Sequence, residues 1–287
     1  MPRNLLPPHR LLYEDLIDRA LAEDLGRAGD LSTDTIIPAD ASAMAAIIAR
    51  QAGRVAGIDV AAAVFERVDP RIRVDVHIPD GQDAPAGGRI ASVSGPARGI
   101  LTGERCALNL LGRLSGIASV TRGMAEAVAP HGARVVCTRK TTPTLRALEK
   151  YAVRCGGGFN HRFGLDDAVL IKDNHIAVAG GIEPAVLRAR EALGHLVPIE
   201  VEVDSLEQLE VALALGVQAV LLDNMDLETL RRAVALTDGR AITEASGGIR
   251  PDTAAAIAAT GVDILSAGWL THSAPTLDVA LDIQIEA

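Results

Sequence analysis

Hydrophobic and polar positions follow two different rhythms along the chain, and the rhythm changes near residue 130. Before that point, apolar residues at helical spacing predict helices over residues 11–25 and 103–129. Alternating apolar and polar residues predict strands over residues 43–49, 71–78 and 90–93. The first part of the chain is therefore expected to fold as a mixed α+β domain.

After residue 130, short β-rich runs alternate with helical stretches. The runs are 135–138, 168–172, 199–203, 219–222, 241–245 and 264–266, and the helical stretches are 205–215, 227–237 and 252–260. Ser205 and Gln208 have the spacing of a capping box, and Pro251 suits the first position of a helix. Alternation of this kind predicts βαβ units and a parallel sheet. Six strands fall short of an eight-stranded barrel, so we expect an incomplete, open α/β barrel. A doubly wound sheet is the alternative, because periodicity does not report closure.

Composition excludes several classes of protein. The chain of 287 residues has room for two modest domains or one barrel, and its longest apolar run, residues 211–222, is too short to span a membrane. Residues 1–10 contain three prolines and no apolar core of a signal peptide, so a cytoplasmic location is expected. Three cysteines without a CxxC motif indicate neither a disulfide framework nor a cysteine zinc site. With 2% aromatic residues and a net charge of −9, nucleic acid is not an expected partner.

Positive charge is concentrated in one part of this acidic chain. Only three of the 28 basic residues are lysines, namely Lys140, Lys150 and Lys172, and all lie within 33 residues of one another. Residues 138–175 carry seven Arg or Lys against four Asp or Glu. This positive segment favours an anionic small-molecule ligand. Lys150, next to Glu149 in a helical stretch, is interpreted as a solvated or ion-paired residue.

The predicted strands end in polar residues or glycine, at the edge where α/β barrels carry their active sites. These ends are Thr138-Arg139-Lys140, Lys172-Asp173-Asn174-His175, Glu200 with Glu202 and Asp204, Asp223-Asn224, Glu244 with Ser246-Gly247-Gly248, and Ser266 with Gly268. Arginine and lysine bind carboxylates and phosphates, which suits Arg139, Lys140, Arg162 and Lys172. Glu202 and Asp223, on neighbouring strands, are candidates to approach one Mg²⁺ or to stabilise a developing cation. Ser246-Gly247-Gly248 before a helix predicts a phosphate site. Glu200 is interpreted as a buried, paired charge of the core.

Three motifs resemble the quinolinate phosphoribosyltransferase family. They are residues 138–143 (TRKTTP), residues 156–158 (GGG) with 160–162 (NHR), and residues 170–175 (LIKDNH). Weaker matches are Glu23-Asp24 with Gly29-Asp30, Gly103-Glu104-Arg105 with Asn109, and residues 200–204, 222–224 and 246–248. The resemblance covers nearly the whole chain. Trp269 stands where a small residue is expected.

The resemblance implies a reaction and a fold. Quinolinate and phosphoribosyl pyrophosphate would give nicotinate mononucleotide, pyrophosphate and CO₂ in de novo NAD biosynthesis, with Mg²⁺ as the cofactor. The implied fold is an N-terminal α/β sandwich, residues 1–112 with 273–287 returning to it, and an open parallel α/β barrel, residues 113–272. It also implies a homodimer with shared active sites, or a hexamer.

The resemblance further implies a role for each site residue. Quinolinate would contact Arg105 of a partner chain together with Thr138, Arg139, His161, Arg162 and Lys172. Lys140, Ser246, Gly247, Gly248, Gly268 and His272 would bind phosphoribosyl pyrophosphate, and Glu202 and Asp223 its Mg²⁺, directly or through water. Lys140, Lys172, Glu202 and Asp223 would be the catalytic residues.

Other functions are compatible with parts of this pattern. A related phosphoribosyltransferase-fold protein would act on another nitrogen acceptor, such as nicotinate. Three arginines at positions 105, 139 and 162 favour a dicarboxylate over a monocarboxylate. A barrel aldolase would use Lys172 as a Schiff-base nucleophile, and a phosphometabolite sensor would bind without catalysis.

Overall fold

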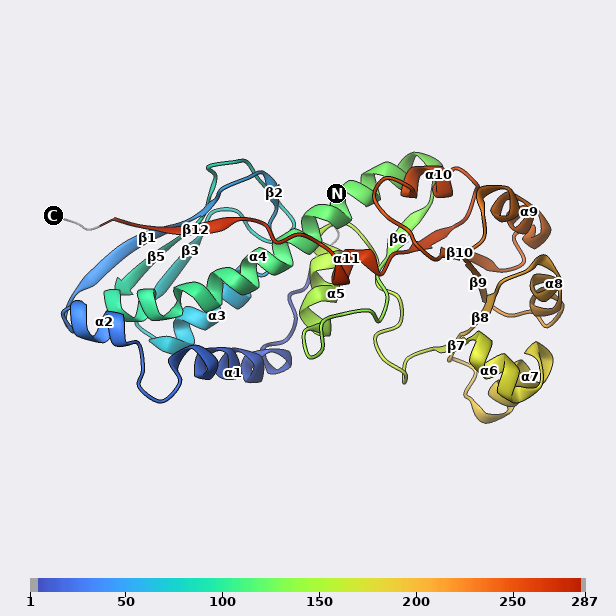
Figure 1. The fold of residues 1–287 in the computed structure, drawn as a ribbon, viewed down its shortest axis with the longest axis horizontal. Helices are drawn as coiled ribbons and strands as arrows, with labels where there is room; N and C mark the ends of the chain where they lie inside the picture. The colour runs from blue at the N-terminus through green and yellow to red at the C-terminus, as the bar shows by residue number, and fades with distance from the viewer. Residues whose placement is uncertain (1–4, 285–287) are drawn as a thin grey trace. The chain divides into compact units, whose positions relative to one another are not determined.

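The computed structural model describes residues 5–284, which form parts of two compact units (Figure 1). The first unit comprises Met1–Arg122, Thr142–Gly157 and Ala274–Ala287, and the second comprises Gly123–Thr141 and Gly158–Ser273. The sequence-based boundary at 112/113 falls inside one unbroken helix, α4 (Ala97–Val128). Helical periodicity continues through that point, so the pattern carries no mark of a boundary there. Residues 142–157, predicted to belong to the barrel, group with the first unit, and residues 1–4 and 285–287 of the predicted ranges lie outside the described part.

The first unit contains an antiparallel four-stranded sheet in the order β12-β1-β5-β3. Its strands are β1 (Ser42–Ala49), β3 (Arg73–Val76), β5 (Arg89–Pro96) and β12 (Val279–Gln284), and β2 (Gly53–Arg54) pairs separately with β4 (Asp83–Ala84). Pairing of β12 with β1, from Ala49↔Val279 to Met44↔Gln284, joins the end of the chain to this sheet.

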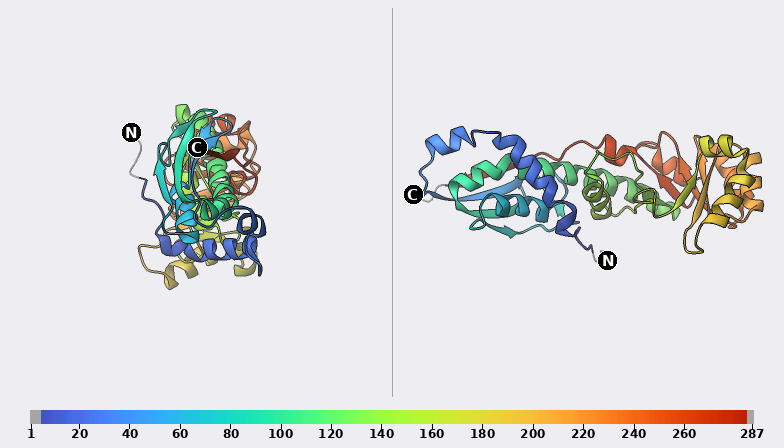
Figure 2. Two further views of the ribbon diagram at one scale, coloured as in Figure 1. Left: turned by 90° about the vertical axis from the view of Figure 1, so that its left-hand side faces the viewer. Right: turned by 90° about the horizontal axis from the view of Figure 1, so that it is seen from below.

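The first unit also contains helices (Figures 1 and 2). They are η1 (Arg10–Leu12), α1 (Glu14–Leu25), α2 (Leu31–Ile36), α3 (Ile58–Val68), α4 and α5 (Arg146–Cys155). The pattern analysis does not predict α3, although it buries Val64 and Phe65 completely. Gly103 of α4 leaves room for the Phe65 ring, because a Cβ there would lie 3.1 Å from it. Close packing of α3 on α4 therefore depends on a small residue.

The second unit contains a parallel six-stranded sheet in the order β6-β11-β10-β9-β8-β7. The strands are β6 (Arg134–Val136), β7 (Val169–Ile171), β8 (Ile199–Val203), β9 (Ala219–Asp223), β10 (Ile242–Ser246) and β11 (Ile264–Ser266). Each overlaps a predicted run, and β8 and β11 match theirs residue for residue. Within residues 5–284, no ladder joins the edge strands β6 and β7, so the predicted open barrel is confirmed.

Helices connect these strands. They are η2 (Ala129–His131), α6 (Asp173–Ala179), α7 (Ile182–Ala192), α8 (Leu206–Ala214), α9 (Leu227–Thr237), α10 (Ala254–Ala258) and α11 (Trp269–His272). The Ser205 hydroxyl accepts a hydrogen bond from the N–H of Gln208 (3.4 Å), as the capping spacing predicts. The helix predicted to begin at Pro251 begins at Ala254, because residues 251–253 form turns. Among the described residues, no helix combines the length and apolarity that crossing a membrane requires.

Candidate active site

A cavity of about 560 Å³ lies where the strands of the parallel sheet end. Its lining consists of Thr138, Arg139, Lys140, His161, Arg162, Leu170, Lys172, Glu202, Leu221, Asp223, Asn224, Glu244, Ser246, Gly247, Gly248 and Ser266. The register explains this convergence, since Ser246 at the end of β10 is level with Asp223 on β9 and Ser266 on β11. Most residues singled out at the predicted strand ends therefore share one cavity.

Two guanidinium groups shape one side of this cavity. Arg162 donates from Nη1 to the carbonyl of Ala168 (3.0 Å), while its buried Nε has no hydrogen-bond partner among the described residues. Burial, and then the nearby charge of Arg139, lower the pKa of Arg162. Two mutually repelling cations beside an unsatisfied donor form a site that an anion with two carboxylates stabilises.

Carboxylates occupy the neighbouring strand ends. Lys172 Nζ lies 3.0 Å from Glu202 Oε2, and the Asp223 carboxylate accepts a hydrogen bond from Asn224 Nδ2 at 3.0 Å. Asn224 has a left-handed backbone with φ of 53°, and its N–H donates to the carbonyl of Ser246 (2.9 Å). Asparagine tolerates this conformation better than most residues. The turn at Asn224 thus holds Asp223 and ties it to the end of β10.

The glycine loop after β10 has no room for side chains at its first glycine. Gly247 has φ of +101°, and a Cβ there would lie 2.1 Å from Asn224 Oδ1. Gly248 also has a positive φ, +60°, but open space around it. The helix that follows, α10, has only five residues and begins at Ala254, three residues after the expected start at Pro251. The phosphate site itself stays a prediction. What the structure retains at this position is a bare backbone loop.

Lys140 is held through its backbone. Its N–H donates to Thr138 Oγ1 (3.0 Å), and its carbonyl accepts from the buried hydroxyl of Thr271 on α11 (2.8 Å). A Cβ at Gly268 would lie 2.8 Å from Lys140 Cδ and 3.3 Å from His272 Cδ2, which places Gly268 and His272 beside this lysine. Neither is among the residues that line the cavity.

His161 belongs to a cluster that pattern analysis missed. Its Nε2 lies 3.0 Å from Glu200 Oε2 and 3.5 Å from Glu244 Oε1, and its Nδ1 accepts a hydrogen bond from the N–H of Arg162 (2.7 Å). Burial, and then the charge of Glu200, raise the pKa of Glu244 to about 7. The sequence held one signal for this cluster, namely the charged residue Glu244 inside the otherwise uncharged strand β10.

The same three side chains offer the donor types of a metal site. One ligand atom from each lies within 4.8 Å of the others. A histidine whose Nδ1 accepts a hydrogen bond carries its proton on Nε2, which then has no lone pair for a metal. In this ring orientation the cluster is therefore a hydrogen-bonded network.

Part of the positive segment lies outside this cavity. Arg146, Lys150 and Arg154 belong to α5 of the first unit. Lys150 is only 1% exposed, so the solvated alternative of its interpretation is wrong, whereas the ion-paired alternative stays a prediction. The amphipathic pattern of α5 misleads here because both faces of the helix are covered.

Arg105, predicted to bind quinolinate from a partner chain, lies on α4 in the first unit. Its side chain is exposed, and its Nη2 lies 3.3 Å from Oε1 of the adjacent Glu104. Its predicted role depends on a second chain and stays a prediction.

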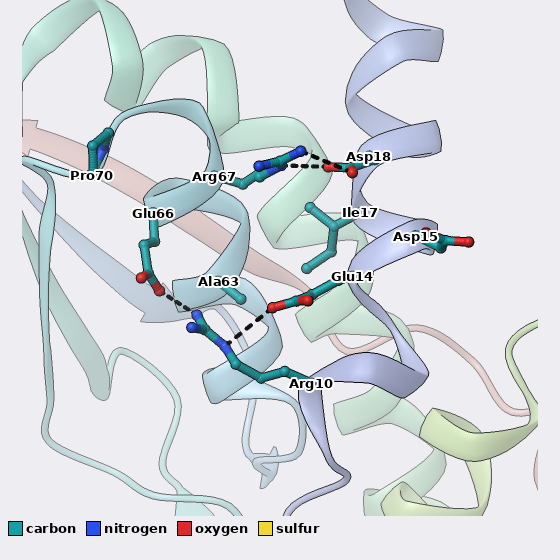
Figure 3. Close-up of a pocket in the computed structure, with 9 residues that line it drawn as sticks. All are labelled: Arg10, Glu14, Asp15, Ile17, Asp18, Ala63, Glu66, Arg67 and Pro70. Carbon is teal, nitrogen blue, oxygen red and sulfur yellow. Dashed lines mark hydrogen bonds and ion pairs between the residues drawn. The ribbon is translucent and has the colours of Figure 1, made fainter.

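A second cavity, of about 460 Å³, lies between α1 and α3 in the first unit (Figure 3). Its arginines are paired with its own carboxylates: Arg10 with Glu14 and Glu66, and Arg67 with Asp18. These charges satisfy one another, in contrast to the repelling arginines at the strand ends. We therefore place the candidate active site at the strand ends.

Sequence comparison matches both units to one enzyme family. The profile described as quinolinate phosphoribosyl transferase, N-terminal domain, matches residues 30–115, and that of the C-terminal domain matches residues 117–282. The chain belongs to the quinolinate phosphoribosyl transferase family.

Relatives of this quinolinate phosphoribosyl transferase family member match along nearly their full length. The nicotinate-nucleotide pyrophosphorylase (carboxylating) of Mycobacterium leprae is 46% identical over 94% of this chain and 96% of its own. A probable enzyme of the same name from Bacillus subtilis is 43% identical, covering 96% and 95%. The crystal structure of NadC from Streptococcus pyogenes superimposes with a TM-score of 0.94 at 39% identity, covering 98% of this chain and 100% of that one. The suspected resemblance and the enzyme class are thus confirmed, and the family is not that of a barrel aldolase.

Proposed function

We propose that this chain transfers a phosphoribosyl group from phosphoribosyl pyrophosphate to quinolinate and removes one carboxylate. The products are nicotinate mononucleotide, pyrophosphate and CO₂, in NAD biosynthesis. Family membership supports the reaction, and one observation supports the site: a single cavity joins two repelling arginines to paired acidic strand ends and a bare glycine loop.

Quinolinate would bind on the cationic side. Arg139 and Arg162 each offer a planar fork that suits a carboxylate, and Lys172 adds a point charge. Thr138, after the end of β6, offers a hydroxyl, and His161 also lines the cavity. A dicarboxylate relieves the repulsion between the two guanidinium groups more fully than a monocarboxylate does, which favours quinolinate over nicotinate.

Phosphoribosyl pyrophosphate would bind across the glycine loop. Main-chain N–H groups of Ser246, Gly247 and Gly248 are suited to a phosphate because no side chain at 247 or 248 covers them. Lys140 and His272, which both lie close to Gly268, would complete the anion site. Lysine is a common phosphate ligand because its ammonium neutralises charge without needing one fixed orientation.

Glu202 and Asp223 fit a Mg²⁺ that arrives with the substrate. Mg²⁺ is usually held by one or two carboxylates together with substrate phosphates and water, which matches the two acidic groups here. When bound, the ion would neutralise charge on the departing pyrophosphate. Glu202 would leave its contact with Lys172, whose ammonium then turns to a quinolinate carboxylate.

The chemistry follows from these positions. The ribose carbon gains positive charge as its bond to pyrophosphate breaks, and Glu202 and Asp223 stabilise that charge. The quinolinate nitrogen bonds to the carbon and becomes a pyridinium. When the carbon–carbon bond to the adjacent carboxylate then breaks, CO₂ leaves and the electron pair stays on the ring carbon, where the neighbouring pyridinium nitrogen stabilises it. That carbon takes up one proton, from water or an acidic group, which completes nicotinate mononucleotide. The protein mainly holds the reactants in place and excludes water.

A dimer would complete the site. Arg105 would enter the cavity from a second chain and add a third arginine to the dicarboxylate subsite, as in the shared-site arrangement that the resemblance implies. A dimer or hexamer, and a cytoplasmic location, are likewise part of this proposal.

One assay tests the proposed reaction. Purified protein with quinolinate labelled in the 2-carboxylate should release labelled CO₂ only when phosphoribosyl pyrophosphate and Mg²⁺ are both present. Lys140→Ala should abolish release while folding stays intact. Equal use of nicotinate as acceptor, or CO₂ release without phosphoribosyl pyrophosphate, would contradict the proposal.

A further inference from the structure

The ring of His161 connects two buried carboxyl groups to the backbone of an arginine in the proposed dicarboxylate subsite. Glu200 Oε2 and Glu244 Oε1 face its Nε2 at 3.0 and 3.5 Å, and the N–H of Arg162 faces its Nδ1 at 2.7 Å. We propose that Glu200 and Glu244 are positioning residues for quinolinate binding, which fix the ring of His161 and thereby the backbone that carries Arg162. This inference rests on the proposed function of the cavity.

The direction of each hydrogen bond follows from the Arg162 N–H. A backbone N–H only donates, so Nδ1 must accept, and the ring proton lies on Nε2. That proton is donated to Glu200, which is the nearer carboxylate. Glu200 therefore sets the tilt of the ring, and the ring in turn sets the position of the Arg162 N–H.

Glu244, the second carboxyl group beside the His161 ring, differs from Glu200 in its protonation. The single Nε2 proton is used by Glu200, and Glu244 Oε1 has no hydrogen-bond partner within the described part of the chain. Glu244 is only 3% exposed, and a buried carboxylate oxygen without a donor is costly, although the Ser266 side chain hydrogen-bonds to this carboxyl group. A proton on Glu244 removes that cost, in agreement with its pKa of about 7.

Ionisation of Glu244 would change the charge next to the substrate. Glu200 and Glu202 on β8 and Asp223 on β9 are the acidic groups around this cavity. Arg139 and Lys140 after β6, His161 and Arg162 after α5, and Lys172 after β7 are the basic ones. An additional negative charge on Glu244 opposes binding of a dianion, so quinolinate affinity should fall as the pH rises through about 7.

Calorimetric titration of quinolinate into the full-length protein, without phosphoribosyl pyrophosphate, tests the pH dependence. Between pH 6 and about 8.5, Kd for the wild type should rise about fivefold or more. Glu244→Gln keeps the shape of a neutral carboxyl and cannot ionise, so its Kd should stay nearly constant. Glu207→Gln, at an exposed position of α8, is the matched control and should follow the wild type.

Variants at Glu200 test the positioning of the His161 ring. Glu200→Ala removes the acceptor of the Nε2 proton and should raise Kd and KM for quinolinate about tenfold, with a smaller change in kcat. Glu200→Gln should restore most of the affinity, because its amide oxygen accepts the same hydrogen bond. Thermal unfolding of each variant shows whether it is folded.

Three outcomes would overturn the inference. A Glu244→Gln variant with the pH dependence of the wild type would remove the role of Glu244, and a loss of kcat at unchanged Kd in Glu200→Ala would remove positioning of the substrate. One equivalent of transition metal in the wild type, lost in Glu244→Gln, would make the cluster a metal site. Failure of the folded wild type to bind quinolinate at all would instead contradict the proposed function.

Discussion

Two glutamates of the cavity differ in their immediate surroundings. Glu202 lies 3.0 Å from the ammonium of Lys172, whereas Glu244 is buried opposite Glu200 with no donor at Oε1. Burial beside a like charge favours the protonated acid, and it raises the pKa of Glu244 to about 7.

The free energy of unfolding should depend on pH through the protonation of Glu244. Its folded-state pKa, about 7, lies above the ordinary glutamate value of 4.5, so the folded protein holds this proton more tightly than the unfolded chain. The contribution of Glu244 to the free energy of unfolding is therefore fully present below about pH 4.5. It is lost as the pH rises through about 7, by about 1 kcal/mol per pH unit. Glu244→Gln should flatten this part of the profile. Urea unfolding of both proteins between pH 5 and about 7.5 measures the difference, and identical slopes would contradict a raised pKa.

Substitution of Glu202 should impair the use of phosphoribosyl pyrophosphate without weakening the binding of quinolinate. Glu202→Ala removes the partner of Lys172 and one candidate Mg²⁺ ligand, so use of phosphoribosyl pyrophosphate should fall by about 100-fold or more in kcat/KM. Quinolinate alone should bind as well as before, or more tightly, because the Lys172 ammonium becomes available to it. Calorimetry with quinolinate and initial rates at varied phosphoribosyl pyrophosphate give the two values. Asp223→Ala should show the same division, and a large loss of quinolinate affinity in either variant would argue against it.

At the scale of elements, loops after the strands make the site. The β9 end turns at Asn224, and the β10 end turns at Gly247, and these two turns touch: the Asn224 N–H binds the Ser246 carbonyl. The helix after the glycine loop, α10, is short and begins six residues after Gly248. The proposed phosphate subsite therefore depends on backbone conformation in the loop.

Gly247→Ala tests that dependence. The added methyl group would collide with Asn224 Oδ1, at 2.1 Å, in a backbone conformation that L-residues rarely adopt. The variant should lose affinity for phosphoribosyl pyrophosphate strongly, by about tenfold or more, because both turns must move. Gly216→Ala is the matched control, since Gly216 also has a positive φ (+65°) but open space around it, after α8. Its activity should be near that of the wild type, and equal losses in the two variants would show backbone strain alone.

At the scale of the whole molecule, the residues that the proposed function requires are divided between two units. Arg105 lies in the first unit, and Lys172 lies in the second. If Arg105 serves a partner chain, each complete site requires the first unit of one chain and the second unit of another. A test of the role of Arg105 is therefore also a test of whether two chains assemble into one complete site.

Mixing two inactive variants answers that question. In a hybrid of Arg105→Ala and Lys172→Ala chains, one site carries both lesions and the other carries neither, so activity should return. Random exchange makes about half of the dimers hybrid, each with one intact site, which sets a ceiling of about a quarter of wild-type activity. Activity of the mixture, with hybrids confirmed by mass analysis, is the measurement. Background activity despite hybrids would mean that Arg105 acts within its own chain or that the two sites are tightly coupled.

Local order in the sequence determined most of the second unit. The runs 199–203 and 264–266 coincide with β8 and β11, and the stretch 227–237 coincides with α9. Periodicity reports a strand or helix because each buries one face, or both, along a short segment. Strand ends then named most of the residues that line the cavity, since parallel strands bring their carboxyl ends to one edge.

Tertiary structure alone decided which distant residues meet and which faces are covered. His161 and Glu200 are 39 positions apart, and no spacing rule relates them to each other or to Glu244. Lys150 resembles a surface residue in its helix, yet packing leaves it 1% exposed, and α4 continues unbroken through the predicted domain boundary. Periodicity depends only on neighbours along the chain. Burial, ionisation and contact depend on every group that the folded chain brings within a few ångströms.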